Sequence, residues 1–103
     1  MTKKHWVIDT GYKSHRQTSK GDFEQLDSTL QFRWVSARNG KAVAVGLNNY
    51  DLYVWDENFG SWEIPKWIEG KIDFYSCKIN WEDEIYCNQS NGYLWHIDLE
   101  NEK

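Results

Sequence analysis

The side chains with the greatest chemical potential in this sequence are two cysteines and three histidines. Cys77 and Cys87 lie on what read as adjacent strands, where they could face one another. Two cysteines without further ligands at suitable spacing are a poor zinc signal, because a structural zinc site takes four ligands. His5, His15 and His96 show neither metal-ligand nor catalytic-triad spacing. We therefore expect no metal site and no cofactor.

The carboxylates offer another route to chemistry, through acid–base catalysis. They gather in two predicted turns, at Asp56 and Glu57 and at residues 82–84. Turn carboxylates are commonly just solvated, and nothing places two of them across a pocket as glycoside hydrolysis requires. A basic run over residues 12–22 could suggest a ribonuclease, but an RNA-binding enzyme rarely has so acidic a body. We expect no enzymatic activity.

The elements that position these side chains form an internal repeat. Residues 32–55 align without a gap on residues 72–95. A period of about forty residues, with short alternating apolar runs and no helical pattern, is typical of stacked β-meanders such as propeller blades. The identical pairs are Ser36/Ser76, Asn48/Asn88, Tyr53/Tyr93 and Trp55/Trp95.

Alternating apolar residues bounded by turn signals predict strands along most of the chain. The Asn39-Gly40 pair is the strongest turn signal and favours a two-residue hairpin. Apolar residues on both sides of the strand at 30–38 indicate a sheet that is covered on both faces. The predicted strands are residues 6–9, 23–26, 30–38, 42–47, 52–56, 61–64, 71–79, 84–88 and 93–98.

We expect a single all-β domain over residues 1–103, with repeat units at about 30–65 and 71–98 and an N-terminal partial unit at 5–29. Its antiparallel four-stranded meanders form part of a propeller or a small open sandwich. A closed propeller needs more blades than these units provide. The sheets therefore assemble from several chains, remain open, or use the N-terminal strand to complete the second unit. The run at 12–22 is expected as a loop.

The repeat also bears on the state of the cysteines. In the ungapped alignment, Cys77 and Cys87 occupy the positions of Ala37 and Leu47, which are apolar packing sites. A thiol at such a site serves as a small hydrophobic group. No segment approaches the length of a membrane span and no signal peptide is evident, so we expect a cytoplasmic location. There, free buried thiols are favoured over the alternative, a disulfide.

The charge is unevenly distributed along the chain. Residues 1–21 carry five basic side chains and one acidic, whereas residues 22–103 carry seven basic and fifteen acidic side chains. An acidic body weighs against nucleic-acid and anionic-membrane partners and is compatible with a basic protein partner.

Seven tryptophans supply much of the apolar surface that this chain can bury. Those on predicted strands, Trp6, Trp34, Trp55 and Trp95, are expected in the core. Trp62, Trp67 and Trp81 lie in or beside turns flanked by acids, and exposed Trp with neighbouring charge is typical of a binding surface. The residues predicted to bind a partner are Asp56, Glu57, Trp62, Glu63, Trp81, Glu82, Asp83 and Glu84.

The segment 53–62, Tyr-Val-Trp-Asp-Glu-Asn-Phe-Gly-Ser-Trp, resembles the strand–turn–strand of tectonin-type and fucose-lectin-type propeller repeats. Those families place an aromatic residue and Asp before a Gly-containing turn and a second Trp. Some such lectins have two blades per chain and trimerise. The resemblance implies an oligomeric lectin in which Trp62 or Trp81 stacks on a sugar.

A second resemblance is one of type. A small, acidic, aromatic-rich β protein without a catalytic signature is similar to bacterial toxin-immunity proteins, including those of contact-dependent growth-inhibition systems. Such proteins typically neutralise a basic nuclease domain by covering its substrate surface. We therefore expect an inhibitory binding protein for a basic partner, best taken as a nuclease toxin, with the lectin as the alternative.

Overall fold

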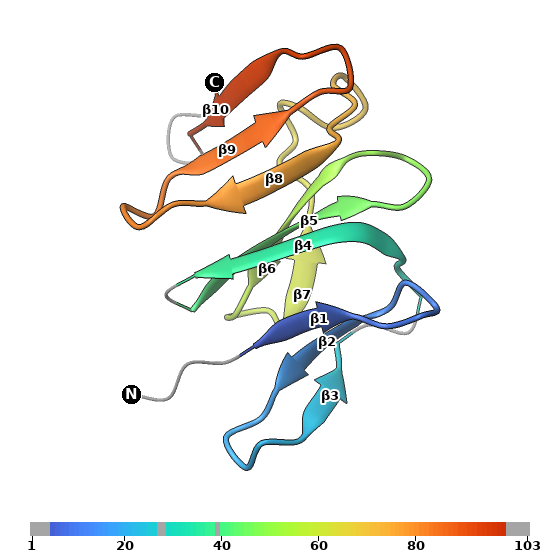
Figure 1. The fold of residues 1–103 in the computed structure, drawn as a ribbon, viewed down its shortest axis with the longest axis vertical. Helices are drawn as coiled ribbons and strands as arrows, with labels where there is room; N and C mark the ends of the chain where they lie inside the picture. Colours follow the sequence, from blue (N-terminus) through green and yellow to red (C-terminus); the bar gives the residue numbers. More distant parts are fainter. Residues whose placement is uncertain (1–4, 27–28, 39, 99–103) are drawn as a thin grey trace.

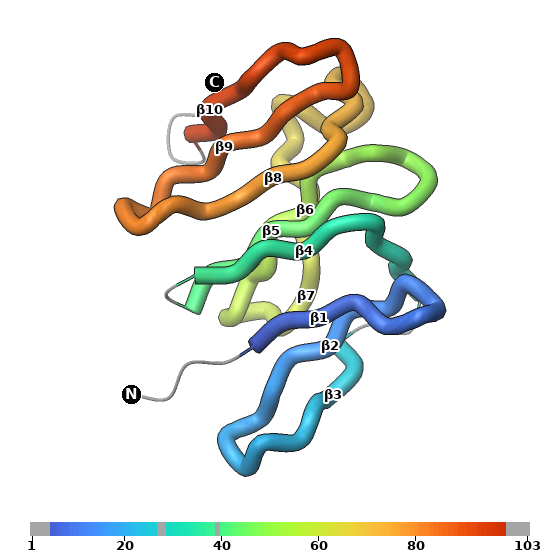
Figure 2. Tube along the Cα trace, in the orientation of Figure 1, coloured from blue at the N-terminus to red at the C-terminus, as the bar shows by residue number. Residues whose placement is uncertain are grey.

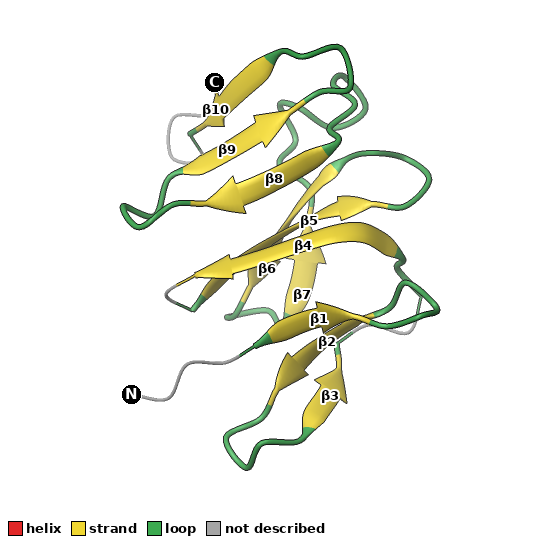
Figure 3. Cartoon of the chain, in the orientation of Figure 1, coloured by secondary structure: helices red, strands yellow, loops and turns green. Residues whose placement is uncertain are grey.

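The computed structural model describes residues 5–26, 29–38 and 40–98, and these residues form ten strands and no helix. The strands make three antiparallel sheets (Figures 1 and 3). The predicted all-β fold of antiparallel meanders is confirmed. The N-terminal sheet holds β1 (Trp6–Ile8), β2 (Ser14–Gln17) and β3 (Phe23–Gln25); the middle sheet holds β4 (Phe32–Arg38), β5 (Lys41–Gly46), β6 (Leu52–Asp56) and β7 (Ser61–Glu63); the third sheet holds β8 (Ser76–Ile79), β9 (Ile85–Asn88) and β10 (Leu94–Ile97).

The sheets stack in the order of the sequence, with the middle sheet between the other two (Figures 1 and 2). Strand β1 packs against β4, and β4 packs against β8, so the first strands of successive sheets are neighbours. Each sheet is a simple meander in which every strand pairs with the next one along the chain. The result is an open stack of three small antiparallel sheets.

Strand β5 explains why the middle sheet is apolar on both faces. Val43 and Val45 belong to the core between the middle and third sheets, whereas Ala42 and Ala44 belong to the core on the side of the N-terminal sheet. All four side chains are completely buried. A strand covered on both faces needs a continuous apolar run, and residues 42–45 supply one.

The N-terminal sheet is attached through a cluster of aromatic rings. Trp6 of β1 lies edge-on to Trp55 and Trp62, with ring centroids 5.8 and 5.7 Å apart, and Trp55 lies 5.3 Å from Trp62. Such pairs contribute about 0.5–1.5 kcal/mol each beyond the area they bury. Three tryptophans therefore hold this interface together.

The strand register shows how the two repeat units correspond. Ala37 pairs with Ala42 in the middle sheet as Cys77 pairs with Cys87 in the third sheet. The ungapped alignment is therefore wrong for the central strand, because the turn at 80–84 is longer than the one that joins β4 to β5. The ungapped alignment is correct again for strands β6 and β10, since the aligned residues Trp55 and Trp95 each pack against the core shared with the preceding sheet.

This register also corrects the expectation of free thiols, because Cys77 and Cys87 form a disulfide. They are direct cross-strand partners with Cα atoms 4.0 Å apart. Closely opposed side chains on paired strands are within bonding reach, whereas the ungapped alignment had matched Cys87 to a residue beyond the end of β5. Both cysteines are buried, as expected, in the core between the middle and third sheets.

Two further predictions need correction. The run at 12–22 is not a loop throughout, because β2 lies within it and pairs with both β1 and β3. The predicted strand at 71–79 is a strand only from Ser76, and residue 74 instead donates its backbone N–H to the carbonyl of Tyr50 at 2.9 Å. Among the described residues, β1 pairs with β2 alone and does not complete the third sheet.

Candidate binding surface

Trp62 is buried, so the prediction that it anchors a partner is wrong. Its side chain is only 5% exposed and packs in the aromatic cluster. It is the central residue of the three-residue strand β7, between half-exposed Ser61 and exposed Glu63. Alternation along a strand turns that central side chain inward whatever the charge of its neighbours. For the same reason Trp62 is not placed to stack on a sugar.

The acidic turn between β6 and β7 is largely occupied by contacts within the chain. The Asp56 carboxylate accepts hydrogen bonds from the backbone N–H groups of Asn58 and Phe59, at 2.9 and 3.2 Å. Glu57 accepts two from the guanidinium of Arg16, at 2.7 and 3.0 Å, and a third from the indole of Trp55. These two acids stabilise the fold, whereas Glu63 is exposed at the end of β7.

Arg16 joins this turn to the N-terminal sheet. Its guanidinium also contacts Glu24 at 3.1 Å and lies 5.5 Å from the rings of both Trp6 and Trp55. Burial opposes its charge, but the hydrogen bonds that Arg16 donates to Glu57 and Glu24 outweigh burial and raise the pKa of Arg16. Arg16, in the basic 12–22 run, thus makes its contacts within the chain.

The acidic turn between β8 and β9 is more open. Asn80 organises it, because its side-chain oxygen accepts the backbone N–H groups of Glu82 and Glu84, each at 2.9 Å. Trp81 is 72% exposed, and the Glu82 side chain forms no ion pair with the described residues. Glu84 contacts His96 at 3.4 Å. This turn presents an aromatic side chain and a carboxylate together.

Asp83 connects this turn to the neighbouring hairpin. Its carboxylate lies 3.7 Å from the ammonium of Lys41, and both side chains are exposed. The β8–β9 and β6–β7 turns both lie toward the left side of Figure 1, in neighbouring sheets. The structure nevertheless links them to different partners, since Asp83 contacts Lys41 and Glu57 contacts Arg16. The eight predicted residues therefore do not form one continuous cluster.

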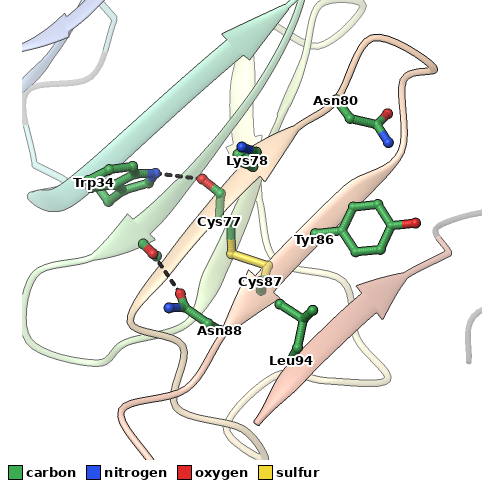
Figure 4. Close-up of a pocket in the computed structure, with 9 residues that line it drawn as sticks. Trp34, Cys77, Lys78, Asn80, Tyr86, Cys87, Asn88 and Leu94 are labelled. Atoms are coloured by element: carbon green, nitrogen blue, oxygen red, sulfur yellow. Dashed lines mark hydrogen bonds between the residues drawn. A yellow bond between two sulfur atoms is a disulfide. The ribbon is translucent and has the colours of Figure 1, made fainter. Parts of the chain in front are cut away.

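Beside the β8–β9 turn lies the outward face of the third sheet. The side chains on this third-sheet face alternate with the buried ones, as a strand requires. A shallow hollow of about 530 Å³ opens on it, and Figure 4 shows the residues that line it. The third-sheet face consists of Ser76, Lys78, Tyr86, Asn88, Leu94 and His96.

Trp34 borders this hollow from β4 and departs from its predicted place in the core. It is 44% exposed, and its indole N–H donates to the backbone carbonyl of Cys77 (Figure 4). Leu94, on the other side of the hollow, is 72% exposed. The hollow is thus lined by an indole and an aliphatic side chain, with the amides of Asn80 and Asn88 beside them.

The repeat indicates what this face is suited to. Asn88 and Leu94 of the third sheet correspond by register to Val43 and Val54 of the middle sheet. Val43 is buried, and Val54 partly buried, against the third sheet. The third-sheet face is therefore the equivalent of a face that already carries a neighbouring sheet, but with polar residues added.

The charge of this region is also acidic. Residues 71–98 carry five acidic and two basic side chains, a net charge of −3, whereas residues 5–26 carry three of each. Lys78 is the basic residue on the third-sheet face, and His96 on that face stacks on Tyr86 at 4.9 Å. The sequence located the acidic turn at 82–84, but it contained no signal for the hollow, which depends on packing between β4 and β8.

The described part of the chain contains no group of three or more His, Cys, Asp or Glu side chains able to hold a metal ion. No helix capable of crossing a bilayer occurs among the same residues. Comparison of the chain with protein-family models, with curated proteins and with solved structures gave no match.

Proposed function

We propose that this chain is a binding protein that neutralises a basic protein partner, best taken as a nuclease toxin. One observation carries the proposal: the third-sheet face and the β8–β9 turn expose aromatic and apolar side chains beside carboxylates. Trp81 and Leu94 are each 72% exposed. Large exposed aromatic residues next to charge are enriched at protein interfaces, where they anchor the partner at low entropy cost.

The chemistry of this surface suits lysine and arginine side chains. Their long alkyl stems pack on apolar surface while the charged end stays at the rim. The hollow beside Trp34 offers the apolar surface, and Glu82 offers a carboxylate without an ion pair among the described residues. The exposed contact between Lys41 and Asp83 is of a kind that contributes only about 0–1 kcal/mol, so a partner can exchange it at little cost.

An acidic binding surface also raises the rate at which a basic partner associates with it. Complementary charge steers association and makes its rate depend on salt, because screening shortens the range of the field. Against a nuclease, carboxylates would occupy the basic surface that otherwise holds phosphates. Inhibition of this kind needs no reactive centre in the inhibitor.

The lectin alternative is weakened by the buried position of Trp62, which leaves Trp81 as its stacking residue.

The disulfide bears on the location of the protein. Disulfides persist in oxidising compartments and are rare in the cytosol. A cytoplasmic location thus implies that Cys77 and Cys87 are held as thiols in the cell. Alkylation of free thiols in intact cells before lysis distinguishes the two states.

The proposal is tested by capture followed by titration. The wild-type chain and the variants Trp81→Ala and Glu82→Lys are immobilised and exposed to an extract of the source organism. Proteins retained by the wild type are identified by mass spectrometry, purified and titrated by calorimetry at low and high salt. We expect a basic protein whose affinity falls with salt and at least about tenfold in either variant, since interface anchors contribute about 2 kcal/mol or more.

The control is Glu69→Lys, which makes the same charge change at another exposed acid, outside the β8–β9 turn. We expect its affinity to stay within a small factor of the wild type. An acidic partner, or a partner that binds Glu82→Lys as tightly as the wild type at every salt concentration, would show that the proposal is wrong. Binding of a glycan that depends on Trp81 would favour the lectin instead.

A further inference from the structure

A second hollow, away from the third-sheet face, contains three irregular features in a small space. The first is a β-bulge. The pairing of β4 with β5 passes from Phe32 opposite Gly46 to Trp34 opposite Val45, which leaves Arg33 without a residue across from it. Bulges re-aim a side chain and are over-represented next to functional sites. Here the redirected side chain is an arginine.

The second feature is the setting of the Arg33 guanidinium. It lies 4.3 Å from the ring centroid of Tyr75 and 5.1 Å from that of Tyr50. It forms neither an ion pair nor a hydrogen bond with any described residue. Two cation–π contacts hold the flat group in place while its five N–H donors have no acceptor among the described residues. In an acidic protein such an arginine is available for an external anion.

The third feature is the backbone of Tyr50, which has a φ of 56°. A bulky residue in the left-handed region is an outlier that costs about 1–3 kcal/mol and persists only where its surroundings impose it. The carbonyl of Tyr50 accepts a hydrogen bond from the backbone N–H of Phe74, at 2.9 Å. The strained residue is thereby fixed beside Arg33.

We propose that this hollow of about 300 Å³ is a binding site for a carboxylate group, which Arg33 receives through two parallel hydrogen bonds. A guanidinium matches the geometry of a carboxylate, and the flanking rings of Tyr50 and Tyr75 leave its edge as the side for approach. The remaining residues that line the hollow are Asp73, Phe74 and Ser90.

Asp73 lines the same hollow as Arg33. Its negative charge opposes the positive charge of Arg33, so an anion is held there by the paired hydrogen bonds of the guanidinium more than by long-range attraction. The hydroxyl of Ser90 and the carboxylate of Asp73 can instead take hydrogen-bond donors that lie beside the bound group. The proposed ligand is thus a carboxylate, whether on a small molecule or on an acidic side chain of a peptide.

The test is a titration of the isotope-labelled chain followed by NMR at the Arg33 side-chain N–H and the ring signals of Tyr50 and Tyr75. Sodium acetate is compared with sodium chloride at equal ionic strength, with sodium phosphate and with glucose. We expect acetate to shift these signals with a dissociation constant on the order of millimolar, as befits a ligand of four heavy atoms. Shifts no larger than those with chloride, or shifts with phosphate or glucose alone, would overturn the proposal.

Two variants distinguish the contribution of the paired hydrogen bonds of Arg33 from that of its positive charge. Arg33→Lys keeps the charge and should weaken acetate binding about tenfold, because the paired hydrogen bonds are lost. Arg38→Lys makes the same change at an exposed position on the same strand and should bind acetate like the wild type. Equal affinity for acetate in Arg33→Lys and the wild type would contradict the assignment, provided both give dispersed spectra.

A last comparison identifies the source of the carboxylate. The peptide acetyl-Gly-Glu-Gly-amide carries one side-chain carboxylate and no terminal charge. Tighter binding than acetate assigns the site to acidic side chains of a polypeptide, and binding equal to or weaker than that of acetate assigns it to small carboxylates. This inference is independent of the proposed neutralisation of a basic protein, because it concerns other residues and a ligand of opposite charge.

Discussion

Trp62 donates a hydrogen bond from its indole nitrogen to the hydroxyl of Ser14 across 3.1 Å, in the buried interface between the middle and N-terminal sheets. Ser14 is completely buried, and Asp51, at 8% exposure, is the other buried polar residue in the described chain. A buried hydroxyl needs a partner, since an unsatisfied one costs about 1–3 kcal/mol. The indole of Trp62 therefore ties β7 to β2 in addition to filling the core.

The replacement Trp62→Phe keeps a ring in the cluster but removes the N–H donor. We expect it to lower the free energy of unfolding by about 1–3 kcal/mol, because the hydroxyl of Ser14 is left without its donor. Urea unfolding followed by circular dichroism measures this. In the double variant with Ser14→Ala, the loss should be smaller than the sum of the single losses. Strict additivity would show that the two residues are not coupled.

Arg16 offers a second test of how the N-terminal sheet is attached. Arg16→Lys keeps the charge but loses the double hydrogen bond to Glu57 and the flat contact with the indoles. We expect unfolding to become easier by about 1–2 kcal/mol. Arg38→Lys, on an exposed part of β4, is the matched control and should change stability by less than about 0.5 kcal/mol. Equal stability of the two variants would show that the contacts of Arg16 with Glu57 and the indoles do not hold the N-terminal sheet in place.

Much of the fold follows from alternation and turn chemistry. Nine of the ten strands coincide with predicted segments, because their apolar residues alternate between turn signals. The exception is β2, whose residues Ser14–Gln17 are all polar. Its pairing is supported by side-chain contacts that no local pattern encodes: His15 with Asp9 and Arg16 with Glu24. Strands whose partners lie elsewhere in the chain escape a periodicity argument.

The binding surface was less predictable, for separate physical reasons. Trp81 is exposed as predicted, because it lies in a turn, but Trp62 lies in a short strand where alternation outweighs acidic neighbours. Alternation was a usable signal for Trp62. The sequence contained no signal for the Arg33 hollow. The β-bulge and the contact of Arg33 with Tyr75 arise only when β4 packs against the segment that follows the middle sheet.

The disulfide should contribute measurably to stability. Cys77 and Cys87 are ten residues apart, and closing a short loop stabilises a protein by about 2–3 kcal/mol in the chain-entropy model. The double variant Cys77→Ala with Cys87→Ala recreates the pair that Ala37 and Ala42 form in the middle sheet. We expect it to fold, with a loss of at least about 2 kcal/mol that includes the smaller side chains.

Mass spectrometry and a reductant check the cause of that loss. The purified chain should be lighter than the reduced one by two hydrogen atoms, and it should take up an alkylating reagent only after reduction. A reductant should destabilise the wild type and leave the double alanine variant unchanged. A wild type that is insensitive to reduction would show that packing, and not the covalent bond, is what the variant loses.

Asp9 makes a pH-dependent contribution. Hydrogen bonds from His15, at 2.7 Å, and from the backbone of Lys13 and Gly11 lower the pKa of Asp9 below its ordinary value of 3.8. A carboxyl group with a lowered pKa in the folded state stabilises the fold above its ordinary pKa, and this contribution is lost as the pH falls through the lower value. Stability should therefore decrease on acidification below about pH 4.

Urea unfolding of the wild type and of Asp9→Asn, at about pH 6 and about pH 3, measures the effect. The asparagine keeps an oxygen for the turn but carries no charge, so its stability should depend less on pH over this interval. Parallel losses in the two proteins would show that the acid sensitivity arises elsewhere in the chain.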